Sequence, residues 1–309
     1  MTLQKLALVY GYILLICLIL LSCTSPANTP TSSFDVIPNQ TSTLIMSNPT
    51  VASTLTINST ANIIPTLPID QANFKFLELL ANNGNCQLPC VWGITPGQSS
   101  YIDAQNILVP LSSISNFTDL STSPGDISPM YTDGDNILAA RMAFLFSMNG
   151  VINHITFQIG IMASSSEFSK KIENYTLQNI LSQHGNPTKV MLSTMAKLPS
   201  SGVPDTFKIL LLYPDQGILV NYTMQMQIVG ENIMGCPSDS SAEFELYASG
   251  QSNSFFDFLE PTGWPQIIEN TYKPIDEVTA MTKDDFYQLF SEQTEECVLT
   301  PASLWPIPN

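Results

Sequence analysis

The fold class of this chain follows from residues 140–159, ARMAFLFSMNGVINHITFQI, in which apolar and polar residues alternate on both sides of a turn sequence. Asn149-Gly150 at the centre suits a two-residue type I′ turn. Pairing outward from this turn gives the apolar pairs Met148/Val151, Phe144/Ile155, Met142/Phe157 and Ala140/Ile159. The opposite face collects Ser147/Ile152, Leu145/His154, Ala143/Thr156 and Arg141/Gln158. One register separates most apolar from polar side chains on both strands, and this predicts an antiparallel hairpin with one buried face.

A second hairpin is predicted around residues 214–217, PDQG. Its strands place three apolar pairs on one face, namely Phe207/Met224, Ile209/Tyr222 and Leu211/Val220. Upstream of this hairpin, residues 175–184 are expected to form a helix ended by Gly185, and residues 188–194 an extended strand.

Two more helices are predicted before the first hairpin. One covers residues 70–83, with Phe74, Leu77 and Leu80 at helical spacing, and the other is capped by Ser99 or Ser100 and runs through Leu108. The order helix then hairpin thus occurs twice, and QNIL at 105–108 recurs at 178–181. We therefore predict an α+β fold, with antiparallel sheets made from β-hairpins, helices packed on one face, and two related units plus a C-terminal extension.

Two short motifs carry a resemblance to a known class of proteins. ITPGQ at 94–98 is followed by a helix, and HGNPTKV at 184–190 ends one; both resemble small bacterial outer-membrane lipoproteins that assist β-barrel assembly. Tandem copies of that module form the β-lactamase inhibitor protein. The resemblance covers residues 93–228 and implies a binding or scaffold role rather than catalysis. The opening at residues 86–97 also resembles uncharacterised bacterial lipoproteins. This chain departs from the pattern in its doubled unit, its cysteines and its acidic tail, so no specific partner carries over.

The N-terminus has the order of charge and hydrophobicity of a secretory signal. Lys5 precedes an almost wholly apolar stretch, which ends in LLSC at 20–23. This ending resembles the lipobox of bacterial lipoproteins, in which the cysteine receives a diacylglycerol and the signal is cut before it. That resemblance implies lipid attachment at Cys23 and a location on the cell membrane or outer surface, outside the cytoplasm. A retained spanning helix is the alternative, although roughly 20 apolar residues are needed to cross a bilayer.

The segment after the signal is expected to be a disordered tether. Residues 24–69 contain 28 Ser, Thr, Pro or Asn among 46 positions, and Asp35 is their single charge. Such a segment buries too little apolar surface to offset its chain entropy. The predicted domains are a signal peptide at 1–22, a tether at 23–69, the first α/β unit at 70–160, the second at 161–230, and an acidic extension packed on the body at 231–309. The extension is expected to contain a strand at 242–248 and a helix beginning at Thr282.

The charge balance excludes nucleic acid as a partner. The chain has 10 basic and 26 acidic residues, and removal of residues 1–22 takes away Lys5 alone, leaving 9 basic and 26 acidic residues and a net charge of −17. Arg141 is the single arginine of the chain, whereas phosphate recognition depends on clustered Arg and Lys. The expected partners are the membrane, through the N-terminal lipid, and another envelope protein.

Of the six cysteines, Cys17 lies in the predicted signal and Cys23 is assigned to the lipid, which leaves four. They are Cys86, Cys90, Cys236 and Cys297. An even number in an exported chain predicts up to two disulfides, with three possible connectivities. Pairing Cys236 with Cys297 is favoured because it would tie down the last segment, while Cys86 with Cys90 would close a small loop.

No catalytic constellation is found in the sequence, and we predict a non-catalytic binding or scaffold protein without a cofactor. The two histidines are His154, on the expected solvent face of a strand, and His184, on the last turn of a helix, where a positive charge is favourable. Two alternatives remain. A thiol-disulfide enzyme would use Cys86 and Cys90, although three residues separate them instead of two. A calcium-dependent adhesin would use DGDN at 133–136, although the distal glutamate of an EF-hand is missing.

Overall fold

The computed structural model describes residues 64–117, 125–133, 136–146, 149–162, 170–195, 205–248, 267–268, 271–292 and 295–305. The chain divides into two compact units, Met1–Ser59 and Thr60–Asn309, and every described residue belongs to the second. The predicted signal, Cys23 and most of the predicted tether therefore lie outside the described residues. Residues 64–68 are described, and the backbone N–H of Leu67 donates to the carbonyl of Pro110 at 3.1 Å. This contact ties the end of the predicted tether to the fold.

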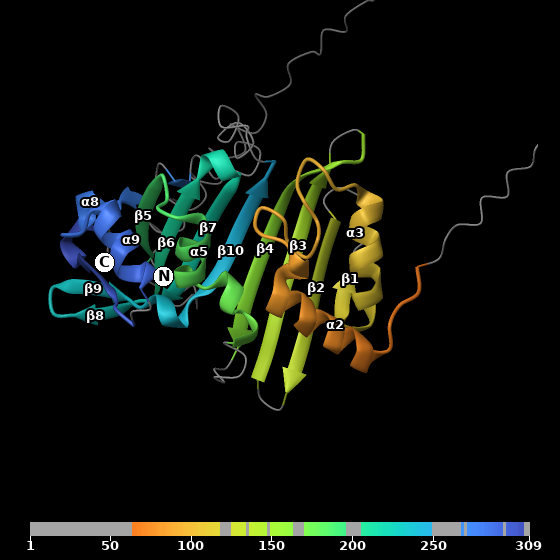
Figure 1. Cartoon of the computed structure of the whole chain (residues 1–309). Helices are drawn as coiled ribbons and strands as arrows, with labels where there is room; N and C mark the ends of the chain where they lie inside the picture. Colours follow the sequence, from red (N-terminus) through yellow and green to blue (C-terminus); the bar gives the residue numbers. More distant parts are fainter. Residues whose placement is uncertain are drawn as a thin grey trace, which may run out of the picture. The chain divides into compact units, whose positions relative to one another are not determined.

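The described residues form one nine-stranded sheet in the order β1-β2-β3-β4-β10-β7-β6-β5-β11, in which all neighbours are antiparallel. Helices α2, α3 and α5 lie in front of this sheet in Figure 1. Its strands are β1 (Ser115–Phe117), β2 (Gly125–Asp133), β3 (Asn136–Phe146), β4 (Ile152–Met162), β5 (Lys189–Met195), β6 (Thr206–Tyr213), β7 (Ile218–Gln225), β10 (Ser241–Tyr247) and β11 (Lys273–Pro274). The predicted α+β class, with antiparallel sheets and helices on one face, is confirmed.

The hairpin registers agree with the alternation in the sequence. In the second hairpin all three predicted apolar pairs are present, and in the first hairpin Phe144 lies opposite Ile155 and Met142 opposite Phe157. The first register shifts near the turn, where Phe146 lies opposite Ile152 instead of Asn153. This irregularity corrects one expectation. Ile152 was assigned to the polar face, but the shift moves it into the core, where it is fully buried.

Strand β10 lies in the middle of the main sheet, between β4 and β7. Phe244 of this strand is opposite Phe157 on β4 and Val220 on β7, and it is fully buried. Residues 231–309 were predicted as an extension packed on the body. Their strand β10 is instead an integral part of the sheet, because it bonds to a strand on each side.

Helix α2 (Ile69–Asn82) contacts the core with a face that only partly matches the predicted one. Of the predicted stripe, Leu80 is buried and Leu77 packs partly buried against the core, but Phe74 is 72% exposed. Ala72, Phe76 and Leu79 are also buried. The exact position of the buried face depends on how the helix docks against the sheet.

The other helices begin where capping residues predict. Ser100 caps α3 (Tyr101–Leu108) and Thr282 caps α9 (Lys283–Ser291), each in a capping box with the aspartate three residues later. Hydrogen bonds from Ser100 lower the pKa of Asp103, and those from Thr282 lower the pKa of Asp285. Thr176 caps α5 (Leu177–His184), and the four-residue α8 (Ile275–Val278) follows β11.

A second, small sheet is formed by three strands in the order β12-β9-β8. Its strands are β8 (Gln227–Val229), β9 (Asn232–Gly235) and β12 (Val298–Pro301). Gly230, with a φ of 62°, is the first of the two turn residues between β8 and β9. The small sheet packs closely on the main one, because a Cβ on Gly235 would lie 2.4 Å from the ring of Phe207 on β6.

Candidate functional site

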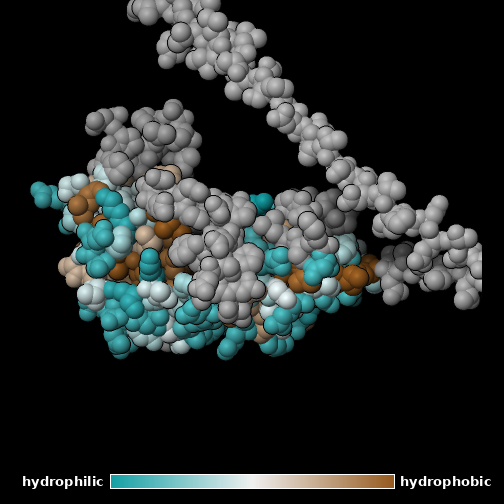
Figure 2. All heavy atoms as spheres, turned by 90° about the horizontal axis from the view of Figure 1, so that it is seen from above, coloured by the Kyte–Doolittle hydropathy of each residue, from teal (hydrophilic) through white to brown (hydrophobic). Residues whose placement is uncertain are grey.

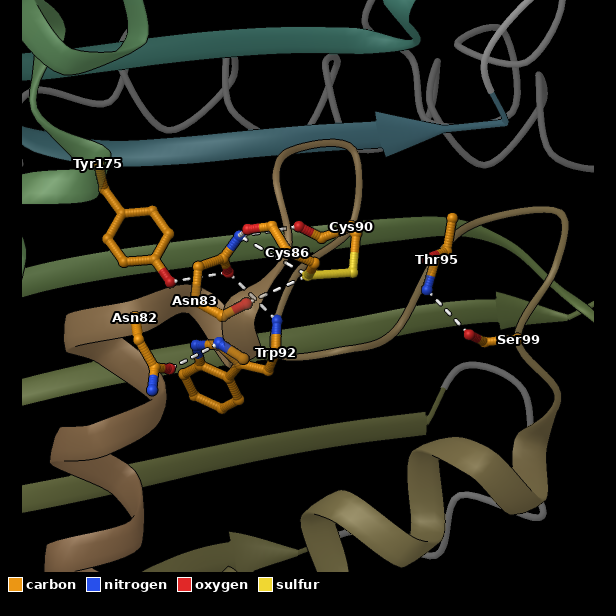
Figure 3. Close-up of a disulfide and its surroundings, with 9 residues drawn as sticks. Asn82, Asn83, Cys86, Cys90, Trp92, Thr95, Ser99 and Tyr175 are labelled. Atoms are coloured by element: carbon orange, nitrogen blue, oxygen red, sulfur yellow. Dashed lines mark hydrogen bonds between the residues drawn. A yellow bond between two sulfur atoms is a disulfide. The ribbon is translucent and has the colours of Figure 1, made fainter. Parts of the chain in front are cut away.

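The loop from Cys86 to Cys90 is closed by a disulfide and lies directly after α2 (Figure 3). The structure joins this pair and also joins Cys236 to Cys297, which is the connectivity favoured from the sequence. The end of α2 that adjoins Cys86 is its carboxyl-terminal end, where the helix dipole disfavours a thiolate. Reactive cysteines of redox enzymes lie instead at helix amino termini. This position therefore fits a structural crosslink better than a redox centre.

Asn83, a residue not singled out in the sequence, holds the loop in place through its side chain (Figure 3). Its amide nitrogen donates to the carbonyls of Cys86 and Cys90, each at 2.9 Å. Its amide oxygen accepts from the backbone N–H of Trp92 at 3.2 Å and from the hydroxyl of Tyr175 at 3.0 Å. Asn83 is 6% exposed, and these four bonds satisfy its buried amide. The amide thereby joins the loop to Tyr175, which directly precedes the cap of α5.

Trp92 anchors the far end of the loop in the core. It is 1% exposed, and its ring meets the rings of Phe76 and Phe157 edge-on at 5.9 and 5.3 Å. Gly84, with a φ of 67°, lies against its backbone, and a Cβ there would come within 2.5 Å of the Trp92 carbonyl carbon. The loop is therefore packed too tightly to admit a side chain at Gly84.

His154 is buried, which corrects the expectation that it faces solvent. It is 4% exposed, and its Nε2 lies 2.5 Å from Oε2 of Glu245 on β10. The hydroxyl of Thr156 donates to the same carboxylate oxygen at 2.9 Å, and the ring of Tyr247 stacks on the imidazole at 4.6 Å. His154 is thus paired with an acidic side chain that the neighbouring strand β10 supplies.

His184 ends α5 as predicted, but its environment differs from the expected one. Its Nδ1 lies 2.7 Å from Oε1 of Gln216, and burial lowers its pKa. The neutral form is therefore favoured, whereas the sequence suggested a cation at the helix end. The two histidines lie in separate contacts, one bonded to Glu245 and the other to Gln216.

The Cys236–Cys297 disulfide crosslinks β9 to β12 in the small sheet. The two cysteines lie directly beyond the pair Val298 and Gly235, with their Cα atoms 4.2 Å apart. On the inner face of this sheet, Ile233, Val298 and Thr300 are buried. The hydroxyl of Thr300 donates to the carbonyl of Val278 and accepts from the indole of Trp305, at 2.7 and 2.9 Å. These contacts fix the small sheet on the body.

The outer face of the small sheet exposes apolar side chains. Two cross-strand rows form this face, Gln227/Met234/Leu299 and Val229/Asn232/Pro301. Val229 is 48% exposed and Leu299 is 47% exposed, while Ile228 on the neighbouring edge is 68% exposed. Figure 2, seen from above, shows hydrophobic residues at the surface on the left, the side on which Figure 1 shows α8, α9 and the small sheet. This face has no counterpart among the predicted sites, although IVGENI at 228–233 carries a hairpin signal.

The described residues contain neither a membrane-spanning helix nor a metal-binding cluster of side chains. The helices of the described part are too short or too polar to cross a membrane. Among the same residues no group of three or more His, Cys, Asp or Glu is placed to hold a metal ion. Residues 134–135 of the suggested calcium loop lie outside the described part of the chain.

No protein-family model, curated protein or solved structure matches this chain. The resemblance to assembly lipoproteins and to the β-lactamase inhibitor protein therefore stays a prediction, as does the division into two related units.

Proposed function

We propose that this chain is a lipid-anchored extracytoplasmic lipoprotein whose folded unit binds another envelope protein without catalysis. The observation that carries the binding role is the outer face of the small sheet. It exposes Leu299 on β12, which a disulfide and a buried inner face hold in place, and Val229 on β8, which pairs with β9. Exposed apolar side chains on a small, well-fixed sheet favour an interaction site over a solvated face.

The anchor supports this role through its geometry and charge. A flexible tether of residues 24–63 would have a root-mean-square length of roughly 35 Å, which keeps the folded unit within reach of the bilayer but clear of it. The acidic chain is repelled by anionic headgroups. Attachment therefore depends on the lipid at Cys23, while the folded unit stays available to a protein partner.

The anchor is tested by Cys23→Ala. The variant should be released from membranes or should keep residues 1–22, and mass spectrometry of the native chain should show the signal removed and a lipid added. A variant that fractionates with membranes as before, together with a native mass that includes residues 1–22, would establish a retained spanning helix instead.

The binding role is tested by photo-crosslinking in the native host. A photoreactive amino acid at Leu299 should give a covalent adduct with an envelope protein after illumination of whole cells. Ile102 on α3 is a matched control site, because it is apolar and 62% exposed but lies on a different element. The same adducts at both sites, or none at Leu299, would contradict a binding role for the small sheet.

A further inference from the structure

Among the described residues, strand β8 forms one edge of the small sheet. It is the last strand in the order β12-β9-β8, and all three of its residues are exposed. Figure 1 shows it at the outer side of the β8–β9 hairpin. An edge strand presents backbone N–H and C=O groups that can pair with another chain, and proteins usually block such edges with lysine, proline or a bulge. Gln227, Ile228 and Val229 include no lysine and no proline, but the strand is only three residues long, so an added strand would pair with it over a short stretch.

The side chains beside this edge would contact an added strand. A new strand next to β8 would extend the outer rows that contain Gln227 and Val229, and its alternate side chains would lie on the same face. Ile228 faces the other side of the edge and is 68% exposed, so it offers an apolar contact there. The edge therefore suits an extended segment with apolar residues on both sides.

Rigidity makes this edge ready to bind. The Cys236–Cys297 disulfide and the buried inner face hold β9 and β12, and β9 in turn orders β8 through its hairpin turn. A partner would consequently order itself against a preformed edge, which reduces the entropic cost of association.

The charges around the small sheet indicate what the ends of the partner segment carry. Glu231 is exposed at the hairpin turn, and Glu295 and Glu296 are exposed just before β12, at the opposite end. Residues 227–236 and 295–301 contain no basic residue. Lysine or arginine at the end of an added strand beside Glu231 would therefore be attracted strongly. At the other end the attraction is weaker, because β8 and β9 separate the added strand from Glu295 and Glu296. A second copy of this chain would bring the same carboxylates and a net charge of −16, which opposes self-association.

We propose that β8 receives an extended segment of a partner protein, which adds a strand to the small sheet, places apolar residues on both faces of that strand, and carries Lys or Arg at its ends. This inference rests on the proposed binding function and specifies its partner. Main-chain bonds supply the affinity in such strand addition, and the flanking side chains supply the specificity.

The test is selection of a random ten-residue peptide library against the complete chain, purified in detergent. Selected peptides should carry consecutive apolar residues at their centre, one for each face of the added strand, and basic residues at their ends. Their affinity should fall at least tenfold for Val229→Glu and stay unchanged for the matched variant Ile102→Glu. N-methylation of the peptide amides that face β8 should abolish binding, whereas methylation of the alternate amides should preserve it.

Charge reversal provides a second arm. The variant with Glu231→Lys, Glu295→Lys and Glu296→Lys should select peptides with acidic instead of basic ends. Unchanged end preferences, equal binding by Val229→Glu and the native chain, or no enrichment at all would overturn the proposal. Light scattering that shows the chain pairing with itself through β8 would also overturn the proposal. So would binding of the lipid-free chain to neutral vesicles, if Val229→Glu abolishes that binding. A Leu299 crosslink obtained alongside any of these results would leave the binding function intact and reject strand addition alone.

Discussion

Replacing Asn83 by alanine tests whether a buried amide, more than the neighbouring disulfide, holds the loop of residues 86–92 in the core. The substitution removes the four hydrogen bonds described above, together with a longer bond from the amide nitrogen to Sγ of Cys86 at 4.0 Å. Two of the groups left behind are donors in buried residues, the backbone N–H of Trp92 and the hydroxyl of Tyr175, which are 1% and 2% exposed as residues. The variant therefore loses bonds that water cannot easily replace.

The size of the effect follows from these two donors. A buried polar group left without a partner costs about 1–3 kcal/mol, so the pair predicts a loss of about 4 kcal/mol in the free energy of unfolding. Asn83 also has a left-handed backbone, with a φ of 51°, which adds about 1 kcal/mol when alanine replaces it. By contrast, the Cys86–Cys90 link closes a loop of five residues, for which the chain-entropy relation gives about 2 kcal/mol.

The assay is urea unfolding of the complete chain under oxidising conditions, followed by tryptophan fluorescence. Asn85→Ala is the matched control, because Asn85 has the same left-handed backbone, with a φ of 61°, but is exposed. It measures the backbone cost alone. If the free energy of unfolding of Asn83→Ala lies within about 1 kcal/mol of that of Asn85→Ala, the buried amide does not hold the loop. The same conclusion follows if the double variant Cys86→Ser, Cys90→Ser loses more stability than Asn83→Ala.

Two further predictions concern the other crosslink and the pH dependence of stability. The Cys236–Cys297 bond spans 61 residues, for which chain entropy gives about 4 kcal/mol. Cys297→Ser should therefore expose residues 295–305 to proteolysis while both hairpins stay folded, and Cys86→Ser should do much less; equal cleavage of the two variants would contradict this order. Burial lowers the pKa of His184 below its ordinary 6.5, so the folded chain takes up this proton at lower pH than the unfolded one. The stability that neutral His184 contributes is present above pH 6.5 and is lost as the pH falls through the pKa of the folded chain. His184→Gln should therefore make the melting temperature less dependent on pH between about 7 and 5. A pH profile that this substitution leaves unchanged would show that burial of His184 does not affect stability.

Local patterns in the sequence were sufficient for the elements whose partners are close along the chain. The turn at Asn149-Gly150 and the alternation around it predict the pairing of Phe144 with Ile155, because a short loop and a period of two leave few competing registers. The caps at Ser100 and Thr282 are equally local. The fold class follows from these elements. The lipid anchor, the binding role and the family resemblance stay predictions, since residues 1–63 lie outside the described part and no known protein matches.

The tertiary structure alone determined the contacts between residues far apart in the chain. Glu245 meets His154 across 91 positions, and Tyr175 meets Asn83 across 92, so neither burial follows from the pattern around one residue. The buried face of α2 likewise depended on docking, because Phe74 and Phe76 both stand at helical spacing from later leucines of the helix and only Phe76 is buried. Strand β10 reached the centre of the sheet for the same physical reason. Periodicity records which side of an element is apolar, but the partner is selected by the packing of the whole chain, where many distant surfaces compete to be buried.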